Sequence, residues 1–135
     1  MAHRRVLVDT SIIIDFLRKQ NKKKSYLWRI KENNTCFMSS VTLFELLAGA
    51  KTERHFDDIK RITKWIESIC FDDDIAKIAS EILKELRAKN DIIDFRDIFI
   101  GATAKCYNLH IATLNTGHFQ RVSDLSVIDI NEISE

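Results

Sequence analysis

The sequence predicts an α/β protein in which a parallel sheet is covered by helices on both faces. Three short and largely apolar runs, at 6–8, 36–39 and 111–114, show no alternation of polar and apolar positions. This pattern is typical of strands that are buried on both faces. Longer segments with helical spacing follow each run, and strands that alternate with helices form right-handed parallel sheets.

Five strands, with helices in the connections between them, follow from these patterns. The strands are expected at 6–8, 36–39, 69–71, 111–114 and 127–130. The helices are expected at 12–17, 25–33, 40–50, 53–69, 72–89, 96–107 and, as one short helix, within 115–121. The fold class is therefore α/β, with a five-stranded parallel sheet.

Polar residues mark the starts of several of these helices. Thr10 or Ser11 can cap the first helix, because hydroxyl oxygens accept hydrogen bonds from the free N–H groups of a helix start. Ser39 or Ser40 can cap the third helix in the same way. Three aspartates at 72–74 suit the positive end of the fifth helix, and we interpret them as a helix start.

One domain spanning residues 1–135 is expected, because the chain has no proline, only three glycines and no low-complexity segment. The three cysteines, Cys36, Cys70 and Cys106, show no CxxC spacing. They are expected to be reduced core residues. No apolar run approaches the ~18 residues of a membrane span, and no signal peptide is evident. A cytoplasmic protein without membrane contact is therefore expected.

Charge is divided unevenly along the chain. Residues 1–65 carry a net charge of +7 and residues 66–135 one of −6, which together give the overall +1. The basic excess is densest around Lys22, Lys23 and Lys24. Such a run is usually a solvated loop, but it can also attract a polyanion such as RNA. These lysines are therefore candidate RNA-binding residues.

Three acidic residues interrupt apolar segments where a strand ends or a helix begins. Asp9 follows the first strand, Glu45 lies in the helix after the second, and Asp97 heads an apolar helix rich in small residues. Each has a structural alternative: Asp9 could cap its helix, Thr42 and Glu45 match a capping box, and Asp97 could favour the helix dipole. Ligands of open α/β sheets bind at the carboxyl ends of the strands, where the three acids could instead converge.

Convergence of three carboxylates requires a cation among them, because like charges a few ångströms apart repel strongly. Hard oxygen ligands with room for water suit Mg²⁺ or Mn²⁺. The chemistry that such a site serves is phosphodiester hydrolysis, in which a bound metal activates a water molecule.

Four motifs, in this order and spacing, resemble the PIN domain family, and specifically the toxin ribonucleases of VapBC toxin–antitoxin systems. The motifs are Val6–Ser11, Thr42–Glu45, Asp97–Ala104 and Ala112–Phe119. The resemblance implies a PIN-like three-layer sandwich with a five-stranded sheet and a Mg²⁺- or Mn²⁺-dependent endoribonuclease acting on RNA. It also implies a homodimer and a cognate antitoxin that inhibits the active site.

The same resemblance implies roles for single residues. Asp9 and Asp97 would be the principal metal ligands, and Glu45 would be the third catalytic acid. Polar support would come from Thr10, Ser11 and Thr113.

The fourth motif departs from the family pattern, because this chain has Asn115 and His118 in a region where many relatives place an aspartate. A neutral amide and an imidazole cannot hold a second cation as a carboxylate would, so the number of metals stays open. Asp94 could contribute to a second site, although a loop or cap role also explains it. His118 could orient a phosphate or a water, or it could lie on the surface without a role.

Other functions share parts of this pattern. Haloacid-dehalogenase-like phosphatases need a second acid two residues after the first, where this chain has Ser11. A non-enzymatic receiver-like module would need a lysine late in the sheet, and none lies near 111–115. Within the PIN family, a housekeeping RNA-processing nuclease is the alternative to a toxin, and the compact chain favours the toxin.

Overall fold

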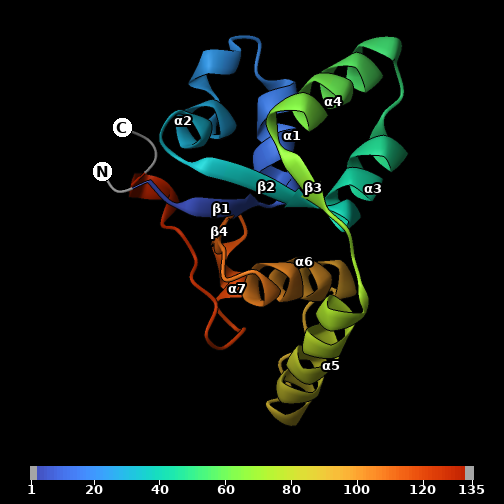
Figure 1. Ribbon diagram of the computed structural model, residues 1–135, viewed down its shortest axis with the longest axis vertical. Helices are drawn as coiled ribbons and strands as arrows, with labels where there is room; N and C mark the ends of the chain where they lie inside the picture. The colour runs from blue at the N-terminus through green and yellow to red at the C-terminus, as the bar shows by residue number, and fades with distance from the viewer. Residues whose placement is uncertain (1–2, 133–135) are drawn as a thin grey trace.

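The computed structural model describes residues 3–132, which form three layers with a parallel sheet in the middle (Figure 1). The described residues contain a four-stranded sheet in the order β3-β2-β1-β4, and every pair of neighbours is parallel. The strands are β1 (Arg5–Val8), β2 (Thr35–Ser39), β3 (Glu67–Ile69) and β4 (His110–Ala112). The α/β class and the parallel sheet are thus confirmed.

The fifth strand, expected at 127–130, does not form, so the prediction of a five-stranded sheet was wrong. Val127 makes a single parallel bridge with Ile111. Two backbone hydrogen bonds of 2.8 Å support it, one from the Ile111 N–H to the Ser126 carbonyl and one from the Ile128 N–H to the Ile111 carbonyl. The chain then enters the 3₁₀ helix η2 (Ile130–Glu132). The apolar residues of this segment pack against the core without extending the ladder.

Helices cover both faces of the sheet. In Figure 1, α1 to α4 lie above the sheet and α5 to α7 lie below it. No helix within residues 3–132 is long and apolar enough to cross a membrane. The helices are α1 (Thr10–Arg18), η1 (Lys22–Lys24), α2 (Tyr26–Asn33), α3 (Ser40–Gly49), α4 (Glu53–Trp65), α5 (Asp73–Ala88), α6 (Phe95–Cys106) and α7 (Thr116–Phe119).

The boundary between α4 and β3 differs from the prediction. The apolar spacing predicted a helix over 53–69, but α4 ends at Trp65 and Ile66 already has an extended backbone. β3 then pairs with β2 from Glu67 to Ile69, two residues before the predicted strand. Pairing with the sheet therefore outweighs the helical periodicity of these residues, as tertiary contacts often do for short segments.

The central strand β1 explains the absence of alternation in the sequence. Val6, Leu7 and Val8 are all 0% exposed. Val6 and Val8 pack into the core beneath α1 to α4, whereas Leu7 packs into the core beside α5 and α6. Full burial of each such side chain contributes about 1.5–3 kcal/mol. The strand therefore joins the two cores and fixes the position of the residue that follows it.

The cysteines follow the prediction only in part. All three are free thiols, with Cys36 buried and Cys106 partly buried. Burial raises the pKa of the Cys36 thiol to about 12. Cys70 is exposed, so its placement in the core was wrong, because the residue lies just after the edge strand β3.

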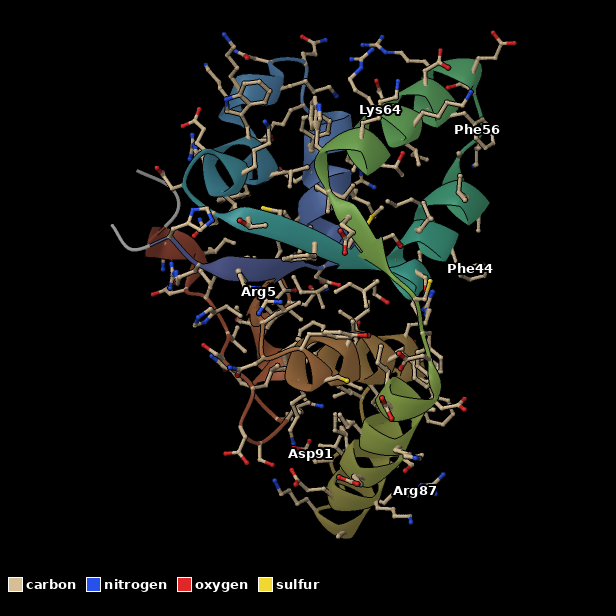
Figure 2. The ribbon with its side chains drawn as sticks, in the orientation of Figure 1. Arg5, Phe44, Phe56, Lys64, Arg87 and Asp91 are labelled. Carbon is tan, nitrogen blue, oxygen red and sulfur yellow. The ribbon has the colours of Figure 1, made fainter. Side chains whose placement is uncertain are left out.

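Some large apolar side chains face away from the sheet. Figure 2 shows Phe44 on α3 and Phe56 on α4 directed outward, and they are 63% and 45% exposed. The apolar pattern of these helices therefore overstates what the core buries.

Candidate active site

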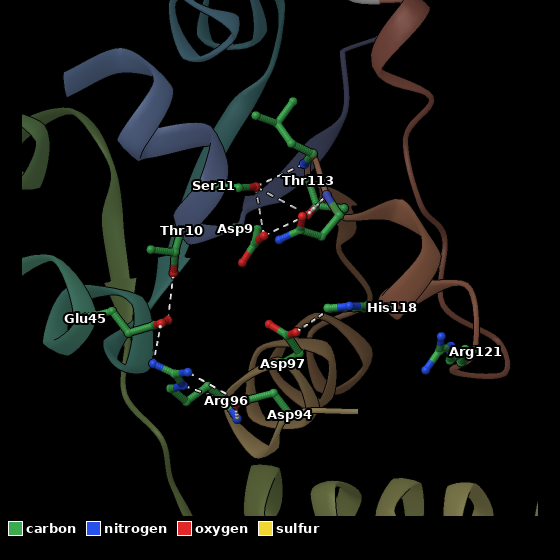
Figure 3. Close-up of polar contacts among 12 residues, drawn as sticks. Asp9, Thr10, Ser11, Glu45, Asp94, Arg96, Asp97, Thr113, His118 and Arg121 are labelled. Carbon is green, nitrogen blue, oxygen red and sulfur yellow. Dashed lines mark hydrogen bonds and ion pairs between the residues drawn. The ribbon is translucent and has the colours of Figure 1, made fainter. Parts of the chain in front are cut away.

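A cavity of about 300 Å³ opens where β1 and β4 end (Figure 3). Residues from α1, α3, α6 and the segment that begins α7 line it. Four carboxylates share the cavity, those of Asp9, Glu45, Asp94 and Asp97. The acids that the sequence singled out therefore meet in one place.

Asp9 sits directly after β1, and its own backbone N–H continues the ladder by donating to the Ala112 carbonyl at 2.9 Å. The residue is 2% exposed. It precedes the first turn of α1, but its side chain makes no cap hydrogen bond. Oδ2 instead accepts from Ser11 Oγ at 3.0 Å and from Thr113 Oγ1 at 2.7 Å. The helix-cap explanation of Asp9 is therefore wrong.

The two hydroxyls that hold Asp9 are themselves fixed by the backbone. Thr113 is fully buried, and its Oγ1 accepts from the Asn115 N–H at 2.9 Å. Ser11 Oγ accepts from the Leu114 N–H at 3.0 Å. This network ties the start of α1 to the segment after β4 and occupies one oxygen of Asp9. The other oxygen of Asp9 faces the cavity in Figure 3.

Glu45 reaches the cavity from the second turn of α3. Ser39 caps this helix by accepting from the Val41 N–H at 3.0 Å, so the capping-box explanation of Thr42 and Glu45 is wrong. Glu45 Oε1 accepts from Thr10 Oγ1 at 2.8 Å. Burial, the largest effect, raises the pKa of the Glu45 carboxyl, and the charges of other carboxylates in the cavity add to this.

Asp97 lies in the first turn of α6, with its side chain 17% exposed. His118 Nδ1 lies 2.8 Å from Asp97 Oδ2. Burial raises the pKa of the Asp97 carboxyl, and the negative charge of Asp9 adds to the effect. As with Asp9, one oxygen is held by a neighbour while the other faces the cavity (Figure 3).

Asp94 caps α6 by accepting from the Arg96 N–H at 2.8 Å, so the cap role predicted for it is confirmed. Its carboxylate also binds the Arg96 guanidinium, with Nε at 3.1 Å from Oδ1 and Nη2 at 3.1 Å from Oδ2. These bonds from Arg96 hold the pKa of Asp94 below its usual range. Asp94 is thus neutralised by a neighbour two residues away.

Comparison with known proteins agrees with this geometry: the PIN domain family matches residues 6–125. The chain belongs to the PIN domain family. It is 30% identical to a protein named Ribonuclease VapC from Rickettsia bellii, over 93% of this chain and 96% of that protein. It is 26% identical to Ribonuclease VapC1 from Methanocaldococcus jannaschii, over 91% of this chain and 85% of that protein.

Solved structures show the same fold. The PIN domain described here superposes on a chain of VapBC2 from Rickettsia felis, which was solved bound to a DNA fragment from its promoter, with a TM-score of 0.81. The two chains are 25% identical, and the match covers 92% of this chain and 97% of that one. The similarity to VapC proteins that the four motifs predicted is therefore confirmed.

The donor set of the PIN domain cavity fits a divalent cation. Asp9 and Asp97 each present one carboxylate oxygen to the same space, and Mg²⁺ in proteins commonly takes one or two carboxylates with several waters. Within residues 3–132, no three acidic, histidine or cysteine side chains are arranged as a ready-made metal centre. Glu45 differs from Asp9 and Asp97 because both of its carboxylate oxygens accept hydrogen bonds, one from Thr10 and one from Arg96.

The PIN domain's lysine run lies away from the cavity. Lys22 closes the end of α1, because its ammonium donates to the carbonyls of Phe16 at 2.8 Å and Leu17 at 2.9 Å. The same ammonium lies 5.0 Å from the centre of the Phe16 ring. Lys23 and Lys24 are exposed in η1. The three lysines therefore have different surroundings despite their identical chemistry.

The sequence reasoning missed Arg96. Its Nη1 lies 3.3 Å from Glu45 Oε2, and the two residues are 51 positions apart. One signal was available: a cation in the first turn of a helix opposes the helix dipole, so an arginine there needs acidic partners. Asp94 lies two residues away in the same helix cap, but the second partner, Glu45, depends on the packing of α3 against α6, which periodicity does not reveal.

Proposed function

We propose that this PIN domain is the toxin of a VapBC-type toxin–antitoxin system and a Mg²⁺- or Mn²⁺-dependent endoribonuclease. The observation that carries the proposal is the pairing of Asp9 and Asp97 in one cavity, each with one carboxylate oxygen that accepts from no donor among residues 3–132. The relatives named Ribonuclease VapC support the reaction class, and the VapBC structures support a partner protein.

The residues of this chain divide the work of such a site. Asp9 and Asp97 would hold the cation, and Ser11, Thr113 and His118 fix the orientation of these two carboxylates. When bound, the metal supplies an activated water and neutralises charge on the phosphate. Fixed partners of this kind matter because loss of one typically lowers metal affinity or activity by about 10–100-fold.

An antitoxin has a suitable surface next to the site. A hollow of about 390 Å³ between α1, α3 and α4 adjoins the cavity, and Ile14 and Glu45 line both. Its walls carry apolar side chains such as Leu17, Leu46 and Ile59. A partner segment bound there through apolar contacts would bring a cationic side chain within reach of the carboxylates, and this would exclude the metal. A homodimer is part of the same proposal.

Growth and RNA integrity test the proposal. Induction of the wild type should arrest growth and produce discrete RNA fragments, and Asp97→Asn should do neither, because asparagine keeps the shape of aspartate without its charge. Co-expression of the neighbouring antitoxin gene should restore growth. Asp124→Asn is the matched control: this exposed residue lies outside the cavity and has a φ of 59°, which asparagine tolerates well.

The possible outcomes distinguish between the functions proposed for the site. Arrest by both the wild type and Asp97→Asn would mean that the protein acts by binding and not by cleavage. RNA fragments without growth arrest would favour an RNA-processing nuclease over a toxin. Full ribonuclease activity in the purified complex would contradict inhibition by the partner.

Substitutions in the lysine run should affect stability and RNA binding separately. Lys22→Ala should lower the free energy of unfolding by about 1–2 kcal/mol, because two charge-assisted hydrogen bonds at the end of α1 are lost. Lys23→Ala with Lys24→Ala should leave stability unchanged and weaken RNA binding. Each lost phosphate contact should flatten the log–log salt dependence by about 0.7. Denaturant melts and RNA titrations at several salt concentrations measure both effects, and an unchanged salt slope would remove η1 from the RNA surface.

A further inference from the structure

We infer that Arg96 is a counter-ion within the site that competes with the divalent cation for Glu45 and thereby sets how tightly the cation binds. The inference rests on the metal that the proposed function requires. It concerns a residue outside the four motifs, whose contacts only the folded structure reveals.

The guanidinium of Arg96 bridges two carboxylates of the cavity. Its Nε and Nη2 bind Asp94 in a two-pronged contact, both at 3.1 Å. This leaves Nη1 to reach Glu45 Oε2 at 3.3 Å (Figure 3). A forked guanidinium that is held on one side by its own helix cap is pre-oriented toward the other side. Arg96 therefore points at Glu45 because Asp94 holds it there.

Both oxygens of Glu45 are engaged by these contacts. Oε1 accepts from Thr10 and Oε2 accepts from Arg96. Among the described residues that line the cavity, Arg96 is the one lysine or arginine, and it shares this cavity with four carboxylates. Its charge lowers the pKa of Glu45, against the larger effect of burial. The guanidinium thus supplies part of the positive charge that a cation would otherwise bring.

A divalent cation that used Glu45 would have to share it with this guanidinium. Two positive charges a few ångströms apart repel strongly in a partly enclosed site. The cation is therefore left with Asp9 and Asp97, and Glu45 becomes available to it only when Arg96 moves away. Removal of the Arg96 charge should consequently tighten cation binding.

Titration of the purified protein with Mn²⁺ by calorimetry tests this without reference to activity. Arg96→Gln should bind Mn²⁺ about tenfold more tightly than the wild type, as expected for the loss of one nearby unit charge. Arg121→Gln is the matched control, because Arg121 pairs with Asp91 at 3.4 Å outside the cavity. It should leave the affinity unchanged. Melting curves without metal verify that each variant is folded.

A double-mutant cycle tests whether the effect passes through Glu45. In a Glu45→Gln background, Arg96→Gln should lose most of its effect on Mn²⁺ affinity. Equal gains in both backgrounds would overturn the competition for Glu45, and so would weaker or unchanged binding by Arg96→Gln alone. If neither the wild type nor Arg96→Gln binds Mn²⁺, both this inference and the metal dependence of the proposed function fail. Binding by both proteins with equal affinity overturns the inference alone.

Discussion

Asp9→Asn should reduce RNA cleavage by more than about 100-fold and remove most of the stabilisation that we expect Mn²⁺ to give to the wild type. Loss of a supporting partner alone costs about 10–100-fold at metal sites, and Asp9 is proposed as a ligand itself. A ligand that binds only the folded state stabilises it by about 2.7 kcal/mol at 100 times its Kd. Paired melting curves with and without Mn²⁺ and one RNA digestion measure both effects.

Without metal, the same variant should be as stable as the wild type or more stable near neutral pH. Burial and neighbouring charges, including that of Asp9, raise the pKa values of Glu45 and Asp97. A carboxyl with a raised pKa in the folded state destabilises the fold as pH rises from its unfolded pKa through its folded pKa. Removal of the Asp9 charge lessens that cost above pH 4.5, the ordinary value of the Glu45 group.

Asp124→Asn serves again as the control for Asp9→Asn, and it should keep both the Mn²⁺ shift and the activity. Asparagine can still accept the hydroxyl hydrogen bonds of Ser11 and Thr113 at position 9, so a general loss of folding is not expected. Equal Mn²⁺-induced shifts in the wild type and in Asp9→Asn would remove Asp9 from the ligand set.

Phe119→Ala should lower the free energy of unfolding by about 3–5 kcal/mol, the range for removal of a buried phenylalanine. Phe119 is 0% exposed and packs against α6, where a Cβ on Gly101 would lie 3.7 Å from its ring. α7 has only four residues and depends on this anchor. Because the preceding residue is His118, the variant should also loosen the contact with Asp97.

Denaturant unfolding of Phe119→Ala beside Phe44→Ala measures the anchor. Phe44 has the same side chain but is 63% exposed, so its loss should change stability by less than about 0.5 kcal/mol. Similar losses in the two variants would mean that α7 is not held by the core.

Much of the fold could be predicted because β1 carries a clear signal. Three consecutive apolar residues without alternation indicate a strand that is buried on both faces, whichever helices cover it. The strand at 67–69 was harder to place, because it has three residues and its apolar spacing continues that of α4. The segment at 127–130 has the composition of a strand, but its pairing stops after one bridge. Whether a segment pairs at the edge of a sheet depends on residues far away in the sequence, which the local apolar pattern does not contain.

The three acids of the site could be predicted because each follows a strand or heads a helix at the same edge of the sheet. The direction of each side chain could not be predicted. Lys22 turns back onto the end of α1, while Arg96 crosses to α3. Such contacts depend on how the helices pack. One basic residue therefore stabilises the end of a helix, whereas another binds a carboxylate of the site.

The bond between Thr113 and Asp9 joins residues 104 positions apart in the chain. A ribosome that adds about 5–20 residues per second would need about 5–20 s between these two positions. During that interval the emerging chain has Asp9 and Ser11 but not Thr113 or α7, and α6 is made only towards its end. The proposed nuclease would therefore stay inert until the residues from Thr113 through α7 have been made.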